Sequence, residues 1–399
     1  MAATLSPSRI SGGAALMDSI TTSLLVGSAL CVVAFVYPYL IYPVLLRLLP
    51  DHKPNADAHI DEPPSASLLF CAYNEAANLP AKIENLRDIK RAYPALEILA
   101  YSDGSTDATN TLLEEAADIL TPVLGRQRLG KIGGMKALVR RAQGEVLIFT
   151  DANVLVEPAA VGRLIGTFCD PQIGAAAATL HYVSRDSARE SATEVTGGAY
   201  WRLEEAIKRE ESRSGSMMGA DGSLFAARRD GYPDLPEDLV DDMAASISVL
   251  FRGQRCVSLS DALAFEHSVS DSAEEFRRKR RIACGSYSTY RYLRPQLARM
   301  GGMDRFKFAS HKLLRWWGGF FLVGGWLLLL AASLRLEFAP ALLALSAGAI
   351  AVGAVGARAG VPVVGMLWEV LLGVCATSLG VVESVRGQRY ATWEPASTR

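Results

Sequence analysis

The chain has 399 residues, a hydrophobic content of 50% and a formal net charge of −1. This length accommodates one catalytic domain and several membrane spans, and the apolar content exceeds that of a typical soluble enzyme. Acidic and basic residues nearly balance, which excludes the global field that recruits nucleic acid. The six cysteines form no CxxC or CxxH pair, so neither a zinc site nor a disulfide framework is expected.

After an N-terminal tail of residues 1–19, the first predicted element is a transmembrane anchor over residues 20–49. It holds about 25 nearly uncharged residues, more than the ~20 that a helix needs to cross a bilayer. No small-residue cleavage site follows it, so we expect it to stay as an anchor. Arg47, His52 and Lys53 lie at or after its C-terminal end, whereas Arg9 is the basic residue before it. The positive-inside rule therefore places the next segment in the cytosol.

Residues 66–285 alternate short apolar runs with helical patterns, which predicts a cytosolic α/β domain with a largely parallel sheet. Strands are expected over 67–71, 96–101 and 146–150, and helices over 77–92, 106–117 and 134–142. Each of the three strands ends in polar residues, where open α/β sheets bind ligands. No GxGxxG or GxxxxGK[ST] loop occurs, so the signatures of dinucleotide-binding and P-loop proteins are missing.

The C-terminal part is predicted to return to the membrane. Interfacial helices are expected over 286–312 and a transmembrane helix over 313–334, whose apolar run from Trp316 follows four basic residues, Arg305, Lys307, Lys312 and Arg315. Residues 338–384 form one or two further transmembrane or interfacial helices, followed by a C-terminal tail of 385–399. Glu369 inside lipid would cost several kcal/mol unless it is shielded, which keeps an interfacial helix open for the last segment.

Seven segments in residues 66–285 resemble, in order and spacing, the motifs of the family-2 inverting glycosyltransferases: LLFCAYNEAANL, YSDGSTDAT, LGKIGGMKAL, FTDANV, GADGSLFAARR, LVDDMAASISVLFRG and FRRKRRIACG. The resemblance implies an α/β nucleotide-sugar domain of the GT-A type with a mostly parallel central sheet, plus α-helical transmembrane segments. The leading anchor and trailing spans resemble the membrane branch that contains polysaccharide synthases and lipid glycosyltransferases.

The resemblance also implies where the donor binds. Ala72, Tyr73 and Glu75 would hold the nucleobase and ribose together with Asp103, whose carboxylate can accept two hydrogen bonds. Lys131 matches the family lysine near the nucleotide and opens a helix whose free N–H groups favour anions. The structural alternatives are that Asp103 caps the next helix and that Lys131 is a solvated surface lysine.

A divalent ion, Mg²⁺ or Mn²⁺, is expected at Asp151 and Asn153, which stand where the family carries its DxD motif. The amide of Asn153 can ligate a hard cation but brings no charge, so the ion should bind more weakly without the nucleotide. His267 is a further conceivable ligand, although a lone histidine near a domain edge is more often structural.

The catalytic base is expected in the acidic run of residues 237–242. In the family, an acidic pair begins a helix that ends at a glycine eleven residues beyond its aspartate, and counting back from Gly253 gives Asp242. Asp238 is the alternative, and these acids could also simply stabilise a helix N-terminus. Asp221 and Gly222 resemble the acceptor-side segment of the family and would line that side of the site.

A basic cluster over residues 277–281 lies where processive family members carry QxxRW. Alignment on Gly285 places Arg278, Arg281 and Ile282 in the three motif positions. Arg281 would neutralise the leaving diphosphate by bidentate pairing. Loss of the tryptophan speaks against polymer extension, and a lipid-headgroup contact is the alternative role for the cluster.

These patterns together predict an inverting glycosyltransferase of polysaccharide or glycolipid biosynthesis, multi-pass in the inner (plasma) membrane, with a cytosolic catalytic domain. The expected donor is a UDP-sugar, and the acceptor is a growing glycan or a membrane lipid, such as a polyprenyl phosphate or a ceramide-like alcohol. The alternative from another class is a catalytically silent component that binds nucleotide or glycan within a polysaccharide export complex.

Overall fold

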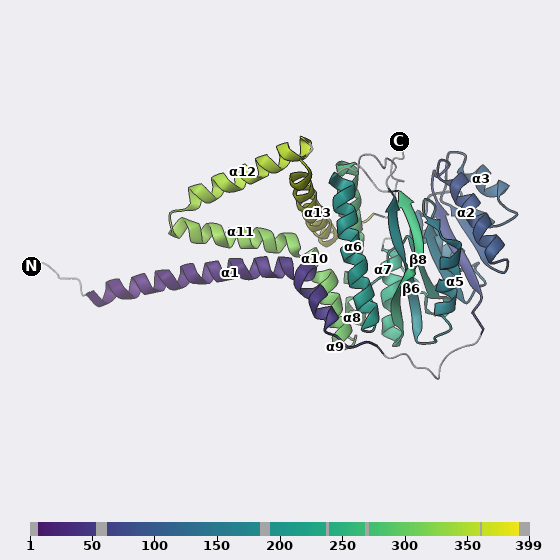
Figure 1. Cartoon of the computed structure of the whole chain (residues 1–399), viewed down its shortest axis with the longest axis horizontal. Helices are drawn as coiled ribbons and strands as arrows, with labels where there is room; N and C mark the ends of the chain where they lie inside the picture. The colour runs from purple at the N-terminus through teal and green to yellow at the C-terminus, as the bar shows by residue number, and fades with distance from the viewer. Residues whose placement is uncertain are drawn as a thin grey trace, which may run out of the picture.

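The computed structural model describes residues 7–52, 62–183, 192–236, 239–267, 271–359 and 361–390. Within them, an eight-stranded sheet stands at one end of the molecule and a set of long helices projects from it (Figure 1). The spatial order of the strands is β3-β2-β1-β4-β7-β6-β8-β5. The strands are β1 (Ala66–Ala72), β2 (Glu97–Ser102), β3 (Thr121–Leu124), β4 (Val146–Asp151), β5 (Leu155–Val156), β6 (Ile173–Val183), β7 (Leu224–Arg228) and β8 (Arg255–His267).

The N-terminal half of the sheet is parallel. β1 pairs in parallel with β2 and β4, and β2 pairs with β3. All seven residues of β1 are buried, as expected for a central strand covered on both faces. Because parallel strands end at the same edge, the polar residues that follow β1, β2 and β4 are gathered there, as the sequence predicts.

The second half of the sheet changes direction. β7 runs antiparallel to both β4 and β6, whereas β6 pairs in parallel with β8. β5 adds an antiparallel edge to β8. Because β7 runs against β4, the chain enters β7 at the edge where β4 ends, so the residues just before β7 lie beside Asp151.

Helices cover both faces of the sheet and enclose two apolar cores. One core lies under α2, α3 and α5, and the other under α4 and α7. The helices of this domain are α2 (Leu79–Ala92), α3 (Thr109–Glu115), α4 (Gly130–Val139), α5 (Pro158–Thr167), α6 (Ala192–Arg213), α7 (Asp241–Ser248) and α8 (Ser272–Leu297), with 3₁₀ turns η2 (Arg229–Gly231) and η3 (Val249–Arg252).

One helix begins earlier than the sequence pattern indicated. The pattern predicts a helix over 134–142, whereas α4 already begins at Gly130. The backbone N–H groups of Leu129 and Gly130 donate to the carboxylate of Asp103, at 2.6 and 3.1 Å, and this anchors the start of the helix. Gly130 has a φ of +77°, a conformation that favours glycine. Lys131 therefore lies in the first turn of α4.

Among the residues that the structure describes, four helices are long and apolar enough to cross a bilayer: α1 (Pro7–Arg47), α11 (Gly318–Arg335), α12 (Ala339–Arg358) and α13 (Pro362–Val385). Their outward side chains are largely apolar and exposed, which makes this a membrane protein. α1, α11 and α12 project away from the sheet, whereas α13 lies beside α6 (Figure 1). The short helices α9 (Gly302–Phe308), η4 (Ala309–Leu313) and α10 (Leu314–Trp316) connect α8 to α11.

A buried polar cluster joins the N-terminal helix α1 to the α/β domain. Glu211 of α6 accepts hydrogen bonds from Tyr42 of α1, at 2.6 Å, and from a ring nitrogen of His311, at 2.9 Å. The other ring nitrogen of His311 lies 2.9 Å from Glu204, which also pairs with Arg315. Buried charges are costly without partners, so separating these helices would leave the buried glutamates unpaired. The hydrogen bonds and ion pairs of the cluster therefore hold α1 and α10 against α6.

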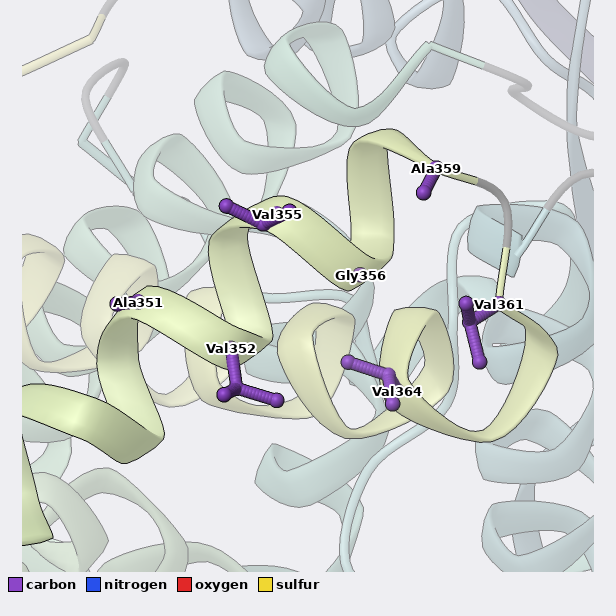
Figure 2. A pocket seen from close by; sticks show the side chains of 7 residues that line it. All are labelled: Ala351, Val352, Val355, Gly356, Ala359, Val361 and Val364. Carbon is purple, nitrogen blue, oxygen red and sulfur yellow. The ribbon is translucent and has the colours of Figure 1, made fainter.

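A groove of about 470 Å³ lies between the end of α12 and the start of α13, at a distance from the polar strand ends. Figure 2 shows its lining, which is wholly apolar and built from small or branched residues: Ala351, Val352, Val355, Gly356, Ala359, Val361 and Val364. Without a polar side chain, this groove cannot orient a nucleotide. The candidate site is therefore at the sheet edge.

Candidate active site

The end of β4 and the first turn of α4 meet in an ion pair. The Nζ of Lys131 lies 2.7 Å from Oδ1 of Asp151, and both side chains are about one-third exposed. Asp151 ends β4 and is paired in register with Cys71 of β1. The lysine therefore lies at the carboxyl edge of the parallel strands, where a bound anion would meet its charge.

The ion pair of Lys131 and Asp151 lies close to the predicted base, Asp242, beside Gly222. A Cβ on Gly222 would lie 2.9 Å from Oδ2 of Asp242 and 3.0 Å from Nζ of Lys131. Gly222 precedes β7, and Asp242 lies in the first turn of α7. Three elements distant in sequence thus converge on one point, and no side chain at residue 222 separates the lysine from the carboxylate.

The environment of Asp242 suits a proton acceptor. Burial, followed by the neighbouring Asp241 carboxylate, raises the pKa of Asp242 to about 7, while Lys131 opposes the rise. Asp241 is buried, and its Oδ2 has no hydrogen-bond partner among the described residues. A carboxylate with a pKa near neutrality combines a large ionised fraction with a strong affinity for the proton. Glu237 and Asp238, the alternative pair, lie outside the described residues.

This environment predicts a particular pH dependence. Only the ionised carboxylate of Asp242 can accept a proton, so turnover should fall as the pH drops below about 7. Asp241→Asn removes the adjacent negative charge, lowers the pKa of Asp242 and should shift the acid limb to lower pH. The measurement is nucleoside diphosphate release from pH 5 to 9, with Asp118→Asn on the far side of the domain as control. Superimposable profiles for the parent and Asp241→Asn would contradict this account.

The acceptor side of the site is held by a buried lysine. Lys208 of α6 donates to Oδ2 of Asp221, at 2.8 Å, and to Glu205, at 2.9 Å. Its ammonium also lies 4.6 Å from the centre of the Trp201 ring. The Trp201 indole donates to the Leu180 carbonyl, at 2.7 Å, and the ring packs against the apolar core. Asp221 is therefore fixed in place immediately before Gly222.

The segment after β1 forms a wall of the expected nucleotide site. The guanidinium of Arg128 stacks on the Tyr73 ring, 3.6 Å from its centre, and together they present a flat face. Ala72 is buried, and its carbonyl accepts from the backbone N–H of Asp103. Glu75 is also buried and accepts a hydrogen bond from Asn78, at 2.7 Å. Tyr73 is thus the most accessible of the three predicted residues of this loop.

Asp103 caps a helix, a role that the sequence suggested only as an alternative to nucleotide binding. Its side chain is fully buried, and both oxygens accept backbone N–H groups at the start of α4. A carboxylate has about four acceptor positions, so contact with a ribose hydroxyl is still open to it. The residue caps α4, rather than the helix that directly follows it in sequence.

Asn153 is bound to a carboxylate that the sequence reading missed. Its Nδ2 donates to Oε1 of Glu266, near the end of β8, at 3.0 Å. Burial raises the pKa of Glu266 to about 7, with Arg278 opposing and Asp151 adding to the rise. A carboxyl group that titrates near neutral pH is therefore close to the amide that replaces the second carboxylate of DxD. His267, the next residue, is exposed at the end of β8.

The two predicted arginines lie near this cluster on α8 and differ in their partners. Arg278 donates to Glu275 at 2.8 Å and faces Glu266 and the Tyr182 hydroxyl. Arg281 has no ion pair among the described residues; burial and Arg278 lower its pKa, and the charge of Asp151 opposes this. Arg281 is thus the cation in this cluster best able to pair with an added phosphate group.

The sequence of this domain is similar to a known protein family and to several known enzymes. Residues 67–235 match the model of Glycosyl transferase family 2. The undecaprenyl-phosphate 4-deoxy-4-formamido-L-arabinose transferase of Proteus mirabilis is 28% identical over 106 residues, which cover 25% of this chain and 32% of the relative. The enzyme of the same name from Pectobacterium carotovorum is 32% identical over 111 residues, covering 27% and 34%. The chain thus matches about a third of the length of these curated relatives.

A solved structure resembles the chain over nearly its whole length. It is the mannosyltransferase PcManGT of Pyrobaculum calidifontis in complex with GDP-Man and Mn²⁺. The sequence identity is 18% and the TM-score 0.67, and the match covers 92% of this chain and 99% of the other. At this identity the likeness concerns the fold: the predicted GT-A type domain with attached membrane helices is confirmed.

Proposed function

Residues 67–235 form a glycosyl transferase family 2 domain, and from this domain and its site we propose that the chain transfers a sugar, with inversion, from a nucleotide-diphosphate donor, most simply a UDP-sugar, to a lipid or glycan acceptor at the membrane. The observation that carries the proposal is the convergence of Lys131, Asp151 and Asp242 around Gly222. In this reaction the acceptor loses a proton as the sugar leaves a diphosphate, so one site must offer both a base and a cation.

The donor is assigned to the edge formed by β1, β2 and β4. Tyr73 and Arg128 offer a face for the base, and Ala72, Glu75 and Asp103 line the loop around the ribose. Lys131 and Arg281 compensate the charge that develops on the leaving diphosphate, and Arg278 supports them from the same helix face. Such fixed charges accelerate the reaction because they require little reorganisation as the bond breaks.

A divalent ion fits this site when a diphosphate is bound. Asp151 and the carbonyl of Asn153 would hold Mg²⁺ or Mn²⁺, with Glu266 at hydrogen-bonding distance from the amide. No group of three or more His, Cys, Asp or Glu within the described ranges could hold a metal ion. Mg²⁺ is commonly bound by one or two carboxylates plus substrate phosphates, so this sparse donor set is adequate with a nucleotide. The ion supplies positive charge to the leaving diphosphate.

Replacing Asn153 with Asp is expected to strengthen binding of the ion. The new carboxylate adds one negative charge beside Asp151, so Mn²⁺ affinity without nucleotide should rise by about tenfold or more. Titration calorimetry with Mn²⁺ alone, and with UDP at saturating and zero Mn²⁺, measures the effect. Asn153→Ala is the matched control and should weaken binding. Equal UDP affinity with and without Mg²⁺ or Mn²⁺ in the parent would show that the metal assignment is wrong.

The charges on the acceptor side favour an alcohol as the reacting group. Asp221, Asp241 and Asp242 lie on this side, and the nearest lysines, Lys131 and Lys208, are already paired with carboxylates. A phosphate acceptor, as named for the undecaprenyl-phosphate relatives, would bring two further negative charges towards the unpaired acids. A hydroxyl needs the base that Asp242 offers. We therefore propose a hydroxyl of a membrane lipid or lipid-linked glycan as the acceptor.

The experiment that tests the proposed function uses the purified full chain in lipid nanodiscs with a panel of nucleotide sugars. Release of nucleoside diphosphate is followed with no acceptor, with undecaprenyl phosphate and with alcohol-bearing lipids. Transfer from one donor to an alcohol lipid supports the proposal, and a preference for undecaprenyl phosphate refutes the acceptor class. Nucleotide binding without turnover on any pair would instead favour the silent component of a polysaccharide export complex.

The membrane placement follows from the flanking charges. Arg47 follows the first span, and a basic group over residues 305–315 precedes α11, so both sides of the catalytic domain are marked as cytosolic. We propose the inner (plasma) membrane with the catalytic domain in the cytosol, where nucleotide sugars are available. Residues 286–297, within the segment expected to be interfacial, continue α8, so the interfacial assignment is proposed for α9 and η4.

A further inference from the structure

The last apolar helix, α13, packs along a charged helix of the catalytic domain. α13 and α8 run parallel: Ser272 donates to Glu369 at one end, and Ser288 is hydrogen-bonded to Ser384, at 2.7 Å, at the other. These contacts span 16 residues of α8, or about 24 Å of helix. Contact over this length leaves no section of α13 long enough to cross a bilayer of about 30 Å independently of α8.

The contact between α13 and α8 is close because one face of α13 carries only small side chains. Gly373, Ala376, Gly380 and Ser384 recur at a spacing of three or four residues, and Ala376 and Ser384 are fully buried. A Cβ on Gly380 would collide with the backbone of α8 at Arg280 and Cys284. The two helices therefore touch through their backbones, and this stripe cannot face lipid.

The charged residues of α8 keep the packed helices α8 and α13 out of the hydrocarbon core of the bilayer. Arg280 pairs with Glu383 of α13, at 3.4 Å, and Arg291 donates to the Ser384 carbonyl, at 2.7 Å. Glu369, the carboxylate that made a span doubtful, is 8% exposed and bonded to Ser272. A transmembrane α13 would draw these arginines and their neighbours into lipid, where each charge is costly.

The segment that follows α13 also returns to the catalytic domain. Arg389 donates to the Ser288 hydroxyl, at 2.8 Å, and the Cys284 thiol donates to the Gln388 carbonyl, at 3.5 Å. Residues 386–390 thus lie on the same side of the membrane as α8. With α1, α11 and α12 as spans, the chain crosses three times and residues 386–390 lie on this side, whereas a fourth crossing would put these contacts out of reach.

The opposite face of α13 is apolar and exposed. Val363, Leu367, Val370, Leu371 and Leu379 are between 40% and 64% exposed. α13 runs across the direction of α1 and α11, beside α6 (Figure 1). At its N-terminal end this face adjoins the apolar groove beneath α12, so it continues the lipid-facing surface of a span (Figure 2).

We propose that α13 is a membrane-surface helix rather than a fourth span, seated at the headgroup boundary with its exposed apolar face in lipid. It is fixed to α8, the helix that carries Arg278 and Arg281, and so it holds the donor-side arginines at a set height above the bilayer. The partner of this face is the lipid surface itself. The inference does not depend on the sugar chemistry.

Thiol labelling tests the number of crossings. In a variant whose six native cysteines are replaced by alanine, single cysteines are introduced at Glu115, Leu336 and Gln388, all exposed. Three crossings predict that an impermeant thiol reagent labels Leu336→Cys in intact cells, while Glu115→Cys and Gln388→Cys are labelled only after permeabilisation. Labelling of Gln388→Cys together with Leu336→Cys would overturn the proposal, whatever the activity of the protein.

Depth measurement tests the orientation of α13 in the nanodisc-embedded chain. Fluorophores on Val363→Cys and Leu371→Cys, both in the exposed apolar face, are quenched by lipids that carry bromine at shallow or deep acyl positions. A surface helix places both probes at the same depth, about 5–10 Å below the headgroups. A span places residue 363 near one headgroup layer and residue 371 near the bilayer centre, about 12 Å deeper. Phe338→Cys and Ile350→Cys, at the start and the middle of the α12 span, are the matched pair that must differ, and equal behaviour of the two pairs would refute the proposal.

Discussion

Asp242→Asn is expected to abolish sugar transfer while it leaves nucleotide affinity close to that of the parent. The substitution preserves the size of the side chain and removes its ability to accept the acceptor proton. Loss of general-base help typically lowers the rate by about 10²–10⁴-fold. The groups assigned to the donor, Lys131, Asp151 and Arg281, are untouched. The measurements are kcat for nucleoside diphosphate release in the presence of acceptor, and UDP affinity by calorimetry.

Asp238→Asn is the matched comparison, because Asp238 is the other acid that the sequence offers as the base. We expect this variant to keep most of its activity, since Asp242 is the acid that meets Lys131 at Gly222. A dead Asp238→Asn beside an active Asp242→Asn would move the base to residues 237–238. Normal turnover by both would remove this acidic segment from the chemistry.

Much of the fold could be predicted from the sequence because its strands are short, apolar and bounded by polar turns. β1, β2 and β4 were expected within one or two residues of their observed ends. The strand-end rule then indicated which polar residues would share one edge. The order and spacing of the motifs supplied the GT-A class, which no single strand could have specified. The pairing of β7 between β4 and β6 is long-range and was not visible in local patterns.

The residues that the sequence did not reveal act through contacts between distant elements. Lys208 lies in the run EEAIKREESR, which is typical of a solvated helix face, yet it is buried against Asp221. Glu266 lies next to the end of β8, much as Asp151 ends β4, so a similar strand-end signal was present, but this strand was not predicted. Asp241 adjoins the predicted base, and its effect on the pKa of Asp242 depends on burial, which a single sequence does not display.

The membrane segments too divide into features that the sequence shows and features that only the packing shows. Length and hydropathy identify α1, α11, α12 and α13 equally well as spans. What separates α13 is the surface it meets, a charged helix rather than lipid, and this becomes apparent only when α8 and α13 are placed side by side. The small-residue stripe of α13 is the sequence feature that carries this information, but helix contacts inside a membrane use the same stripe.

Gly222→Val is expected to lower turnover by about 10²-fold without lowering the thermal stability of the protein. A Cβ at this position would already lie 2.9 Å from Oδ2 of Asp242 and 3.0 Å from Nζ of Lys131, and the valine methyl groups would push both aside. A displacement of about 1 Å in a reacting group can cost this factor. Gly222 is not among the glycines with positive φ, so the substitution does not strain the backbone.

A graded series separates a blocked site from general damage. Gly222→Ala should fall between the parent and Gly222→Val, since a single methyl group can be accommodated by small shifts of two flexible side chains. Gly166→Val, in α5, adds the same side chain where a Cβ meets nothing within 4 Å, and it should leave turnover unchanged. UDP affinity should weaken in Gly222→Val, because Lys131 is displaced from Asp151. Full activity of Gly222→Val would mean that donor and acceptor do not meet between Lys131 and Asp242, and the proposed site would have to be abandoned.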